Sequence, residues 1–217
     1  MMSKIAPHYC CGCDRIGSLL CDNCKYNIIS DKETICINCR RPASISNLCG
    51  DCKVPYERAW IVGKREKVLQ RLIGLYKFER AKEAHIQLAD LLLATLPVLP
   101  DNLVIVPVPT TSAHIRERGY DHCCLVARRL AKIRGLKIEK LLSRKTNTKQ
   151  RQASAKLRQK QAKDAFEINK KPDADKIYLL IDDVVTTGAT IKYAALNLRK
   201  AGAKHVWVAA IARQALD

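Results

Sequence analysis

The chain has 217 residues, of which 39 are Lys or Arg and 21 are Asp or Glu, so that its formal net charge is +18. This length suits one ordinary domain, or one domain with a small appendage. A hydrophobic share of 47% excludes wholesale disorder, because enough apolar residues are present to offset chain entropy.

The longest apolar stretch, residues 91–99, contains Pro97 and is followed by Pro100. It is too short for a transmembrane helix, which needs about 20 residues. The first ten residues lack the apolar segment of a signal peptide. We therefore expect a cytoplasmic protein without stable membrane insertion.

Residues 1–58 have little periodicity and many Cys, Asn and Asp residues, which predicts loops and short turns organised by metal. The pattern changes at residue 59, where a short strand over 59–62 is predicted. Apolar residues at helical spacing then predict helices near residues 68–76 and 86–96. The compact apolar run of residues 103–106 predicts a buried strand.

A helix is expected to begin after Thr111 or Ser112, with an apolar face that extends to Ile133. Further along the chain, buried strands are predicted at 177–181 and 206–211, with a helix over 189–201 between them. Alternating strands and helices with continuous apolar strands predict a parallel α/β sheet that has helices on both faces.

Positive charge is concentrated in residues 132–171, which carry 14 basic and 3 acidic side chains. Such a segment favours a polyanionic partner. Residues 143–163 within it are polar and basic and predict a mobile loop. The alternative is that this loop is solvated and only keeps the protein soluble.

Nine of the eleven cysteines lie in the first 52 residues. Disulfides are rare in a reducing compartment, so metal binding explains this clustering better. Four C-x2-C pairs follow one another, and two such pairs make a closed four-thiolate site that is typical of structural zinc. The simplest assignment makes residues 1–58 a double zinc ribbon with two sequential sites: Cys10, Cys13, Cys21 and Cys24, then Cys36, Cys39, Cys49 and Cys52.

Spacing leaves other assignments open, because the first pair can also combine with the third and the second with the fourth. Cys11 can replace Cys10, although the single residue between Cys11 and Cys13 makes a poorer knuckle. Cys123 and Cys124 are expected to be small buried apolar residues. The five histidines show no ligand spacing and are not expected to bind metal.

The most informative segment is IYLLIDDVVTTGAT, residues 177–190, in which an apolar strand leads into Asp182 and Asp183. Backbone N–H groups at a helix N-terminus, together with Thr hydroxyls, form an anion site, and Gly188 lets the backbone approach a phosphate. The two carboxylates can accept hydrogen bonds from vicinal ribose hydroxyls. Open α/β sheets bind ligands at the carboxyl ends of central strands. The segment therefore predicts a sugar-phosphate site.

Residues 182–190 resemble the 5-phosphoribosyl-1-pyrophosphate (PRPP) motif of type I phosphoribosyltransferases. With the C-x2-C pairs, the VPVP stretch at 106–109, the RERGY stretch at 116–120 and the basic segment from Arg144, the whole chain resembles the ComF family of ComFC-type competence proteins. The resemblance implies a type I phosphoribosyltransferase-like domain over residues 59–217, behind the zinc ribbons.

The resemblance also implies that PRPP binds together with Mg2+, which arrives on the pyrophosphate. Pro109 and Thr110 would lie in the pyrophosphate loop, and residues 143–163 would close over PRPP. Asp182 and Asp183 would hold the ribose. The residues expected to contact PRPP in the motif are Asp182, Asp183, Val184, Val185, Thr186, Thr187, Gly188, Ala189 and Thr190.

The chain departs from the family pattern at two places. The family has RGFNQ where this chain has RGYDH at residues 118–122, so that Asp121 replaces a neutral amide. The stretch after VPVP carries fewer charges than is usual. Both departures bear on pyrophosphate binding and leave the phosphate loop unchanged.

The resemblance implies a protein that binds PRPP, or a related nucleotide, and single-stranded DNA, and that acts in DNA uptake. It would work at the cytoplasmic side, as a peripheral protein at the inner face of the membrane if it is membrane-associated, with a competence helicase as a further candidate partner. Binding would depend on charge, since Phe166 is the sole aromatic residue near the basic run. The residues expected to contact DNA are Arg144, Lys145, Lys149, Arg151, Lys156, Arg158 and Lys160.

The alternative is an active phosphoribosyltransferase that moves ribose 5-phosphate from PRPP to a nucleobase or related acceptor and releases pyrophosphate. Arg or Lys side chains and Mg2+ would then stabilise the leaving group. No motif in the sequence selects an acceptor, and no catalytic residue is assigned. A third alternative makes PRPP a regulatory ligand of a DNA-binding protein.

Overall fold

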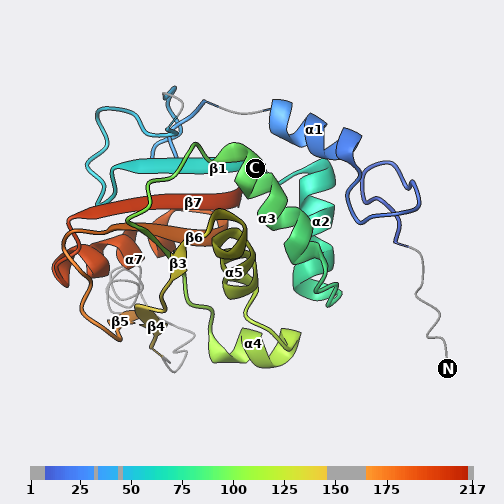
Figure 1. Cartoon of the computed structure of the whole chain (residues 1–217). Coiled ribbons are helices and arrows are strands. Elements are labelled where there is room, and N and C mark those ends of the chain that lie inside the picture. Colours follow the sequence, from blue (N-terminus) through green and yellow to red (C-terminus); the bar gives the residue numbers. More distant parts are fainter. Residues whose placement is uncertain (1–7, 32–33, 44–45, 146–164, 215–217) are drawn as a thin grey trace, which may run out of the picture.

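The computed structural model describes residues 8–31, 34–43, 46–145 and 165–214. These residues form a five-stranded parallel sheet in the order β1-β7-β6-β2-β3, together with a separate antiparallel pair, β4-β5. Figure 1 shows the sheet at the centre of the molecule. The strands are β1 (Arg58–Lys64), β2 (Leu103–Pro107), β3 (Lys137–Ile138), β4 (Leu142–Arg144), β5 (Phe166–Ile168), β6 (Ile177–Val185) and β7 (His205–Arg213).

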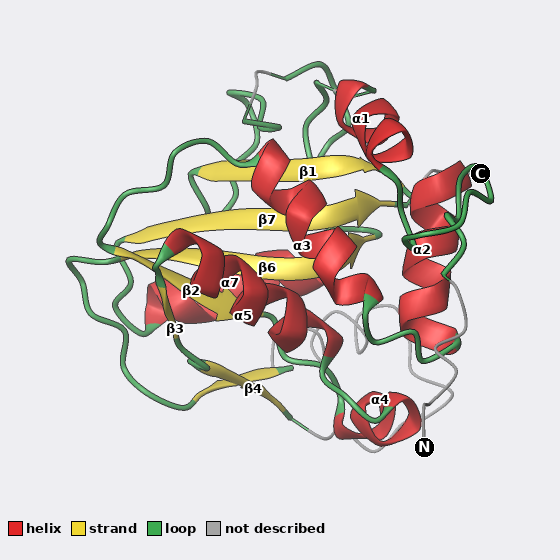
Figure 2. Cartoon of the chain, turned by 45° about the vertical axis from the view of Figure 1, so that its right-hand side comes forward, coloured by secondary structure: helices red, strands yellow, loops and turns green. Residues whose placement is uncertain are grey.

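Helices cover both faces of this sheet, as the sequence predicts. Figure 2 shows α3 and α5 crossing one face while α7 lies behind the other. No helix of the described residues is both long and apolar enough to cross a bilayer. The helices are α1 (Asp22–Ser30), α2 (Lys67–Phe78), α3 (Ala84–Thr95), α4 (Ser112–Arg118), α5 (His122–Arg134) and α7 (Ala189–Lys200).

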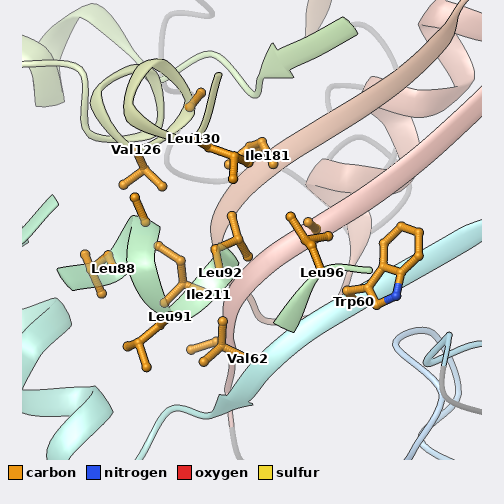
Figure 3. Close-up of a cluster of buried hydrophobic side chains, with 14 of the residues drawn as sticks. Trp60, Val62, Leu88, Leu91, Leu92, Leu96, Val126, Leu130, Ile181 and Ile211 are labelled. Atoms are coloured by element: carbon orange, nitrogen blue, oxygen red, sulfur yellow. The ribbon is translucent and has the colours of Figure 1, made fainter. Parts of the chain in front are cut away.

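Each face of the sheet has its own hydrophobic core. Between the sheet and α3 and α5, Leu92, Leu130 and Ile181 lie in one cluster (Figure 3). On the α7 side, Tyr178 and Leu198 belong to a second cluster. Each fully buried aliphatic side chain contributes roughly 1.5–3 kcal/mol, so both faces stabilise the position of β6.

The two cysteine-rich segments join different cores. Cys10 and Leu20 belong to the cluster on the α3 side, whereas Ile37 belongs to the cluster on the α7 side. The second segment also covers the outer edge of β1, because the Ser46 carbonyl and the Asn47 side chain accept backbone N–H groups of β1. The edge strand is thereby protected from pairing with another chain.

The single helix predicted after Thr111 is in fact two helices. α4 ends at Gly119, which adopts a left-handed conformation with φ of +82° that favours glycine. The Asp121 side chain then caps α5 by accepting the backbone N–H of Cys124. Ile133 is 49% exposed, so its predicted place on the buried face was wrong.

β6 is four residues longer than predicted. It continues to pair with β7 through Asp182 opposite Ala210 and Val184 opposite Ala212. Because the acidic pair therefore lies within the strand, ladder hydrogen bonds fix its backbone. Of the predicted loop 143–163, the first residues belong to β4, and residues 146–163 lie outside the described residues.

Candidate functional site

A crevice opens at the carboxyl ends of β2 and β6. From β2 the chain runs through α4 and α5 to β3, whereas from β6 it runs through α7 to β7, on the other side. The loops diverge at this point, which is where open α/β sheets bind ligands. The crevice is a pocket of about 240 Å³. Its lining is Lys77, Val108, Pro109, Thr110, Thr111, His114, Arg118, His122, Cys123, Arg144, Asp182, Asp183, Val184 and Thr190.

Asp183 is the most strongly bound carboxylate of the pocket. Its Oδ2 lies 2.5 Å from Nζ of Lys77 and 2.6 Å from Nε2 of His122. Its Oδ1 accepts the backbone N–H of Val184 at 2.5 Å. Burial opposes ionisation, but the hydrogen bond from His122 and the Lys77 cation outweigh it and hold the pKa of Asp183 below its usual range. Asp183 is therefore an anion at neutral pH.

The hydrogen bonds around His122 fix its tautomer. Its Nδ1 lies 2.9 Å from Nη1 of Arg118, and a guanidinium can only donate. Nδ1 is therefore the acceptor, and the ring proton is on Nε2, where it faces Asp183. A continuous chain of polar contacts results, from Arg118 through His122 and Asp183 to Lys77.

Asp182 lies in a different environment. Its Oδ1 accepts the backbone N–H of Asp183 at 2.9 Å and lies 3.7 Å from the Cys123 thiol. Burial, together with the neighbouring charge of Asp183, raises the pKa of Asp182 to about 7. Burial also raises the pKa of Cys123, which is therefore a thiol donor. The pKa values of the two carboxyl groups are therefore shifted in opposite directions, although the residues are adjacent in the sequence.

Two tyrosines fix α2 against the start of α5 and so place Lys77. The Tyr76 hydroxyl donates to the His122 carbonyl at 2.8 Å, and the Tyr120 hydroxyl donates to the Tyr76 carbonyl. The two rings stack with their centroids 5.3 Å apart. Because Tyr76 precedes Lys77, these contacts direct the ammonium group into the pocket.

The predicted phosphate loop follows β6 directly. Thr186 and Thr187 are exposed, and Gly188 has φ of +74°, a left-handed conformation that lets the chain turn into α7. Thr187 Oγ1 accepts the backbone N–H of Ala189 at 3.4 Å. Residues 186–188 connect β6 to α7 outside the pocket lining, as do the flanking Val185 and Ala189, whereas Thr190 lines the pocket itself.

The second cysteine-rich segment backs this turn. A Cβ placed on Gly188 would lie 3.9 Å from the Ile37 carbonyl oxygen. Arg213, at the end of β7, donates from Nη1 to the Cys36 carbonyl at 3.3 Å. Arg40 donates to the Gln214 carbonyl, and the Gln214 N–H in turn bonds Val185. The cysteine segment and the phosphate turn therefore share one hydrogen-bond network.

The cysteine sulfurs gather in the sequential arrangement. In each of two groups, all four Sγ atoms lie within 4.8 Å of one another: Cys10, Cys13, Cys21 and Cys24, and Cys36, Cys39, Cys49 and Cys52. Individual Sγ–Sγ distances are 3.6 Å for Cys13 and Cys21 and 3.4 Å for Cys39 and Cys49. A tetrahedral zinc site with Zn–S bonds of about 2.3 Å requires about 3.8 Å, so both donor sets can hold zinc.

Two residues beside the first cysteine group, Gly12 and Cys11, have different relations to its sulfurs. Gly12 N–H points to Cys10 Sγ at 3.4 Å, and a Cβ on Gly12 would lie 2.6 Å from Cys24 Sγ. Cys11 is outside the group, because its thiol faces the Val68 carbonyl at 3.8 Å. Cys11 is therefore a buried packing residue beside the ligand set.

The expected DNA contacts divide into three parts. Arg144 lines the pocket, and its guanidinium lies 5.6 Å from the ring centroid of Phe166, which is itself buried. Lys145 is exposed, and its backbone N–H bonds the Ala165 carbonyl. The other predicted contacts lie outside the described residues: Lys149, Arg151, Lys156, Arg158 and Lys160.

Sequence reasoning missed three groups at the site. Lys77 carried no signal, because it lies in an ordinary amphipathic helix. His122 was not expected to bind metal, and Cys123 was expected to be a buried apolar residue. Their donor atoms and an Asp183 oxygen nevertheless lie within 4.8 Å of one another. The RERGY stretch was the one available signal, since it ends two residues before His122.

Searches against known proteins gave consistent relatives, although no protein-family model matches. DNA utilization protein YhgH of Escherichia coli K12 is 32% identical over 208 residues, which cover 89% of this chain and 90% of that protein. The chain belongs to the ComF family. Competence protein F of Haemophilus influenzae is a ComF relative with 27% identity, covering 89% of this chain and 96% of its own. Competence protein ComFC of Bacillus subtilis is 26% identical over 84% of this chain and 79% of its own.

Solved structures were also compared with this ComF family member. A purine phosphoribosyltransferase from Pyrococcus horikoshii matches with a TM-score of 0.38 and 22% identity, covering 63% of this chain and 75% of that one. An allosteric regulatory enzyme of purine biosynthesis matches with a TM-score of 0.40 and 22% identity, covering 57% of this chain and 24% of that one.

Proposed function

We propose that this protein is a ComF-type competence protein that binds PRPP, or a related nucleotide, with Mg2+, and that also binds single-stranded DNA at the cytoplasmic side during DNA uptake. The observation that carries the proposal is the acidic pair of β6, placed in a crevice directly before the TTGAT turn. Relatives named for competence and for DNA utilization support the DNA role.

In this proposal each part of PRPP meets a different part of the crevice. Ribose hydroxyls donate to Asp182 and Asp183, and the 5′-phosphate lies against residues 186–190, where N–H groups at the start of α7 attract an anion. The pyrophosphate lies toward Thr110, within reach of Arg118 and Arg144, which line the same pocket. Mg2+ neutralises pyrophosphate charge when it is bound.

The ligand must change the protonation and pairing of the acidic pair. A ribose hydroxyl that donates to Asp183 Oδ2 competes with Lys77, which lies 2.5 Å from that atom. Asp182, whose pKa is raised to about 7, accepts a second hydroxyl more strongly as a carboxylate than as a neutral acid. Binding is therefore expected to release a proton and to displace the Lys77 ammonium toward the ligand's phosphates.

Both cysteine groups are proposed as structural zinc sites. Four thiolates close the coordination shell, which leaves no open position for catalysis. The sites would instead hold the two N-terminal segments against the two cores of the domain. Zinc binding would then contribute directly to folding of these segments.

Phosphoribosyl transfer remains the second candidate function. The observation that favours it is that two guanidinium groups, of Arg118 and Arg144, line the pocket beside Pro109. Cations placed there would stabilise a leaving pyrophosphate. Release of pyrophosphate from Mg-PRPP in the presence of a nucleobase panel distinguishes transfer from binding alone.

Calorimetric titration of the zinc-loaded protein with Mg-PRPP tests the ligand. We expect saturable binding that is at least about tenfold weaker in Asp183→Asn, whereas Asp173→Asn, a carboxylate outside the pocket, binds like the wild type. Fluorescence anisotropy of a labelled single-stranded oligonucleotide over a salt series tests DNA binding. Absence of binding at low salt would overturn the DNA role.

A further inference from the structure

A second hollow, larger than the crevice, lies between the first cysteine-rich segment and α2. Its volume is about 830 Å³. We call it the α2 groove and define it by Tyr9, Arg65, Lys67, Arg71, Gly74 and Phe78, which all line it. None of these residues belongs to the lining of the PRPP pocket.

Two aromatic side chains are exposed at the α2 groove. Tyr9 is 54% exposed and Phe78 is 66% exposed, and they come from different segments of the chain. Phe78 is one of only two phenylalanines in the sequence, and the other, Phe166, is buried. Exposed rings beside a hollow are the kind of surface on which unpaired bases stack.

Cationic side chains alternate with these rings. Lys67 and Arg71 are one helical turn apart on α2, and Gly74 and Phe78 continue the same stripe. Arg65, which directly follows β1, adds a third cation, and its Nη1 also donates to Gln214 Oε1 at 2.8 Å. The acids at the groove, Asp14 and Glu79, are fewer. Asp14 lies 3.7 Å from Arg71, and both side chains are exposed, so this ion pair is weak and can yield to a phosphate.

Gly74 lines the groove without contributing a side chain. Glycine disfavours a helix interior relative to alanine, yet no atom of the described residues lies within 4 Å of a Cβ built on Gly74. Neither packing nor backbone conformation therefore demands glycine here. Its effect is to leave open space between Arg71 and Phe78.

We propose that the α2 groove binds single-stranded DNA, with bases stacked on Tyr9 and Phe78 and phosphates bound by Arg65, Lys67 and Arg71. The inference rests on the proposed DNA role and moves the base contacts away from the basic segment, where Phe166 is buried. Duplex DNA hides its base faces, so the alternation of rings and cations selects a single strand. Affinity would fall with salt because phosphate contacts release counterions.

The test is anisotropy of a fluorescent oligothymidine with the full-length, zinc-loaded protein. Phe78→Ala and Tyr9→Ala should each weaken binding about tenfold. Gly74→Leu, which fills the floor and favours the helix, should weaken it similarly. Arg71→Ala should lower the slope of log affinity against log salt by about one. The matched controls are Tyr26→Ala, an exposed tyrosine on α1 that does not line the groove, and Lys204→Ala, an exposed lysine elsewhere.

The outcomes separate this inference from the proposed function. Loss of affinity in the groove variants with unchanged controls supports the inference. Wild-type affinity in Phe78→Ala, Tyr9→Ala and Gly74→Leu overturns the inference but leaves the DNA role intact. No binding by the wild-type protein overturns both. Equal zinc content and equal thermal unfolding of the variants show that a loss is local.

Photochemical cross-linking gives an independent location. Oligothymidine with 5-iodouracil should cross-link to peptides that contain Tyr9 or Phe78, as identified by mass spectrometry. Cross-links confined to residues 144–163 would overturn the inference. If a single-stranded RNA of the same length competes tenfold better than DNA, the groove is an RNA site and the DNA assignment fails.

Discussion

Lys77 of α2 and Asp183 of β6 form an ion pair at 2.5 Å, with only 14% and 10% of the two side chains exposed. The pair links a helix from the first part of the domain to the central strand. Removing one partner of a buried pair leaves the other charge uncompensated, which is more costly than removing both.

We therefore expect Lys77→Met to lower the free energy of unfolding at pH 7 by about 3 kcal/mol. Asp183→Asn should have a similar cost, and the double variant should cost clearly less than the sum of the two. Urea unfolding of the four proteins measures this cycle. Strictly additive changes would mean that the pair contributes no coupling energy.

Asp182 predicts a pH-dependent stability. Its pKa in the folded protein is raised to about 7 from a usual value of 3.8, by burial first and by the charge of Asp183 second. Between these values the folded state binds more protons than the unfolded state, so stability falls as the pH rises from about 4 to 7, by up to about 1.4 kcal/mol per pH unit. Asp183 acts in the opposite direction, because its lowered pKa removes stability only as the pH falls below about 4.

Comparison of wild type with Asp182→Asn isolates this effect. The stability of the variant relative to wild type should increase between pH 5 and 7 and stay constant above pH 8. Urea unfolding at four pH values measures it. A difference that does not change with pH would show that Asp182 titrates at its usual value.

Alanine substitutions of two glycines in the cysteine knuckles, Gly12 and Gly50, are expected to differ in their effect on metal content. Gly12→Ala would place a Cβ 2.6 Å from Cys24 Sγ, whereas a Cβ on Gly50, beside Cys49, meets nothing within 4 Å. We expect Gly12→Ala to lose the metal of the first group and Gly50→Ala to keep both metals. Zinc released to a colorimetric chelator after thiol modification gives the stoichiometry. Full zinc content in Gly12→Ala would contradict this expectation.

The second cysteine group should influence PRPP binding more than the first. Ile37 lies against Gly188, and Arg213 bonds the Cys36 carbonyl, so this segment supports the phosphate turn. We expect Cys39→Ser to weaken Mg-PRPP binding at least about fivefold and Cys13→Ser to change it less than twofold. Calorimetry with parallel zinc analysis measures both. Equal effects would mean that the two groups stabilise the fold alike and have no specific link to the site.

Local patterns in the sequence were sufficient to predict the parallel sheet and the cysteine groups. Hydrophobic runs and C-x2-C spacing are short-range properties of the sequence, so they can be recognised without knowledge of tertiary contacts. The break at Gly119 was missed because every residue of the predicted apolar face follows it, from Cys123 on, and a glycine can be tolerated inside a helix. The length of β6 was missed because acidic residues are rare in buried strands.

The side chains that complete the crevice could not be predicted in the same way. Lys77 reaches Asp183 only because the end of α2 lies against the start of α5, and nothing near Lys77 in the sequence encodes that contact. The α2 groove has the same origin, since Tyr9 and Phe78 meet only after folding. Scarcity of aromatic residues near the basic run predicted no stacking surface, but scarcity along the sequence did not preclude two rings gathering in space.

Lys77 and Phe78 are consecutive residues of α2, yet one lines the crevice and the other lines the groove. A ligand that draws the Lys77 ammonium away from Asp183 therefore acts on the residue next to Phe78. If PRPP in the crevice alters DNA affinity at the groove, DNA must alter PRPP affinity by the same factor. The last turn of α2 would then be the shortest physical connection between the two ligands.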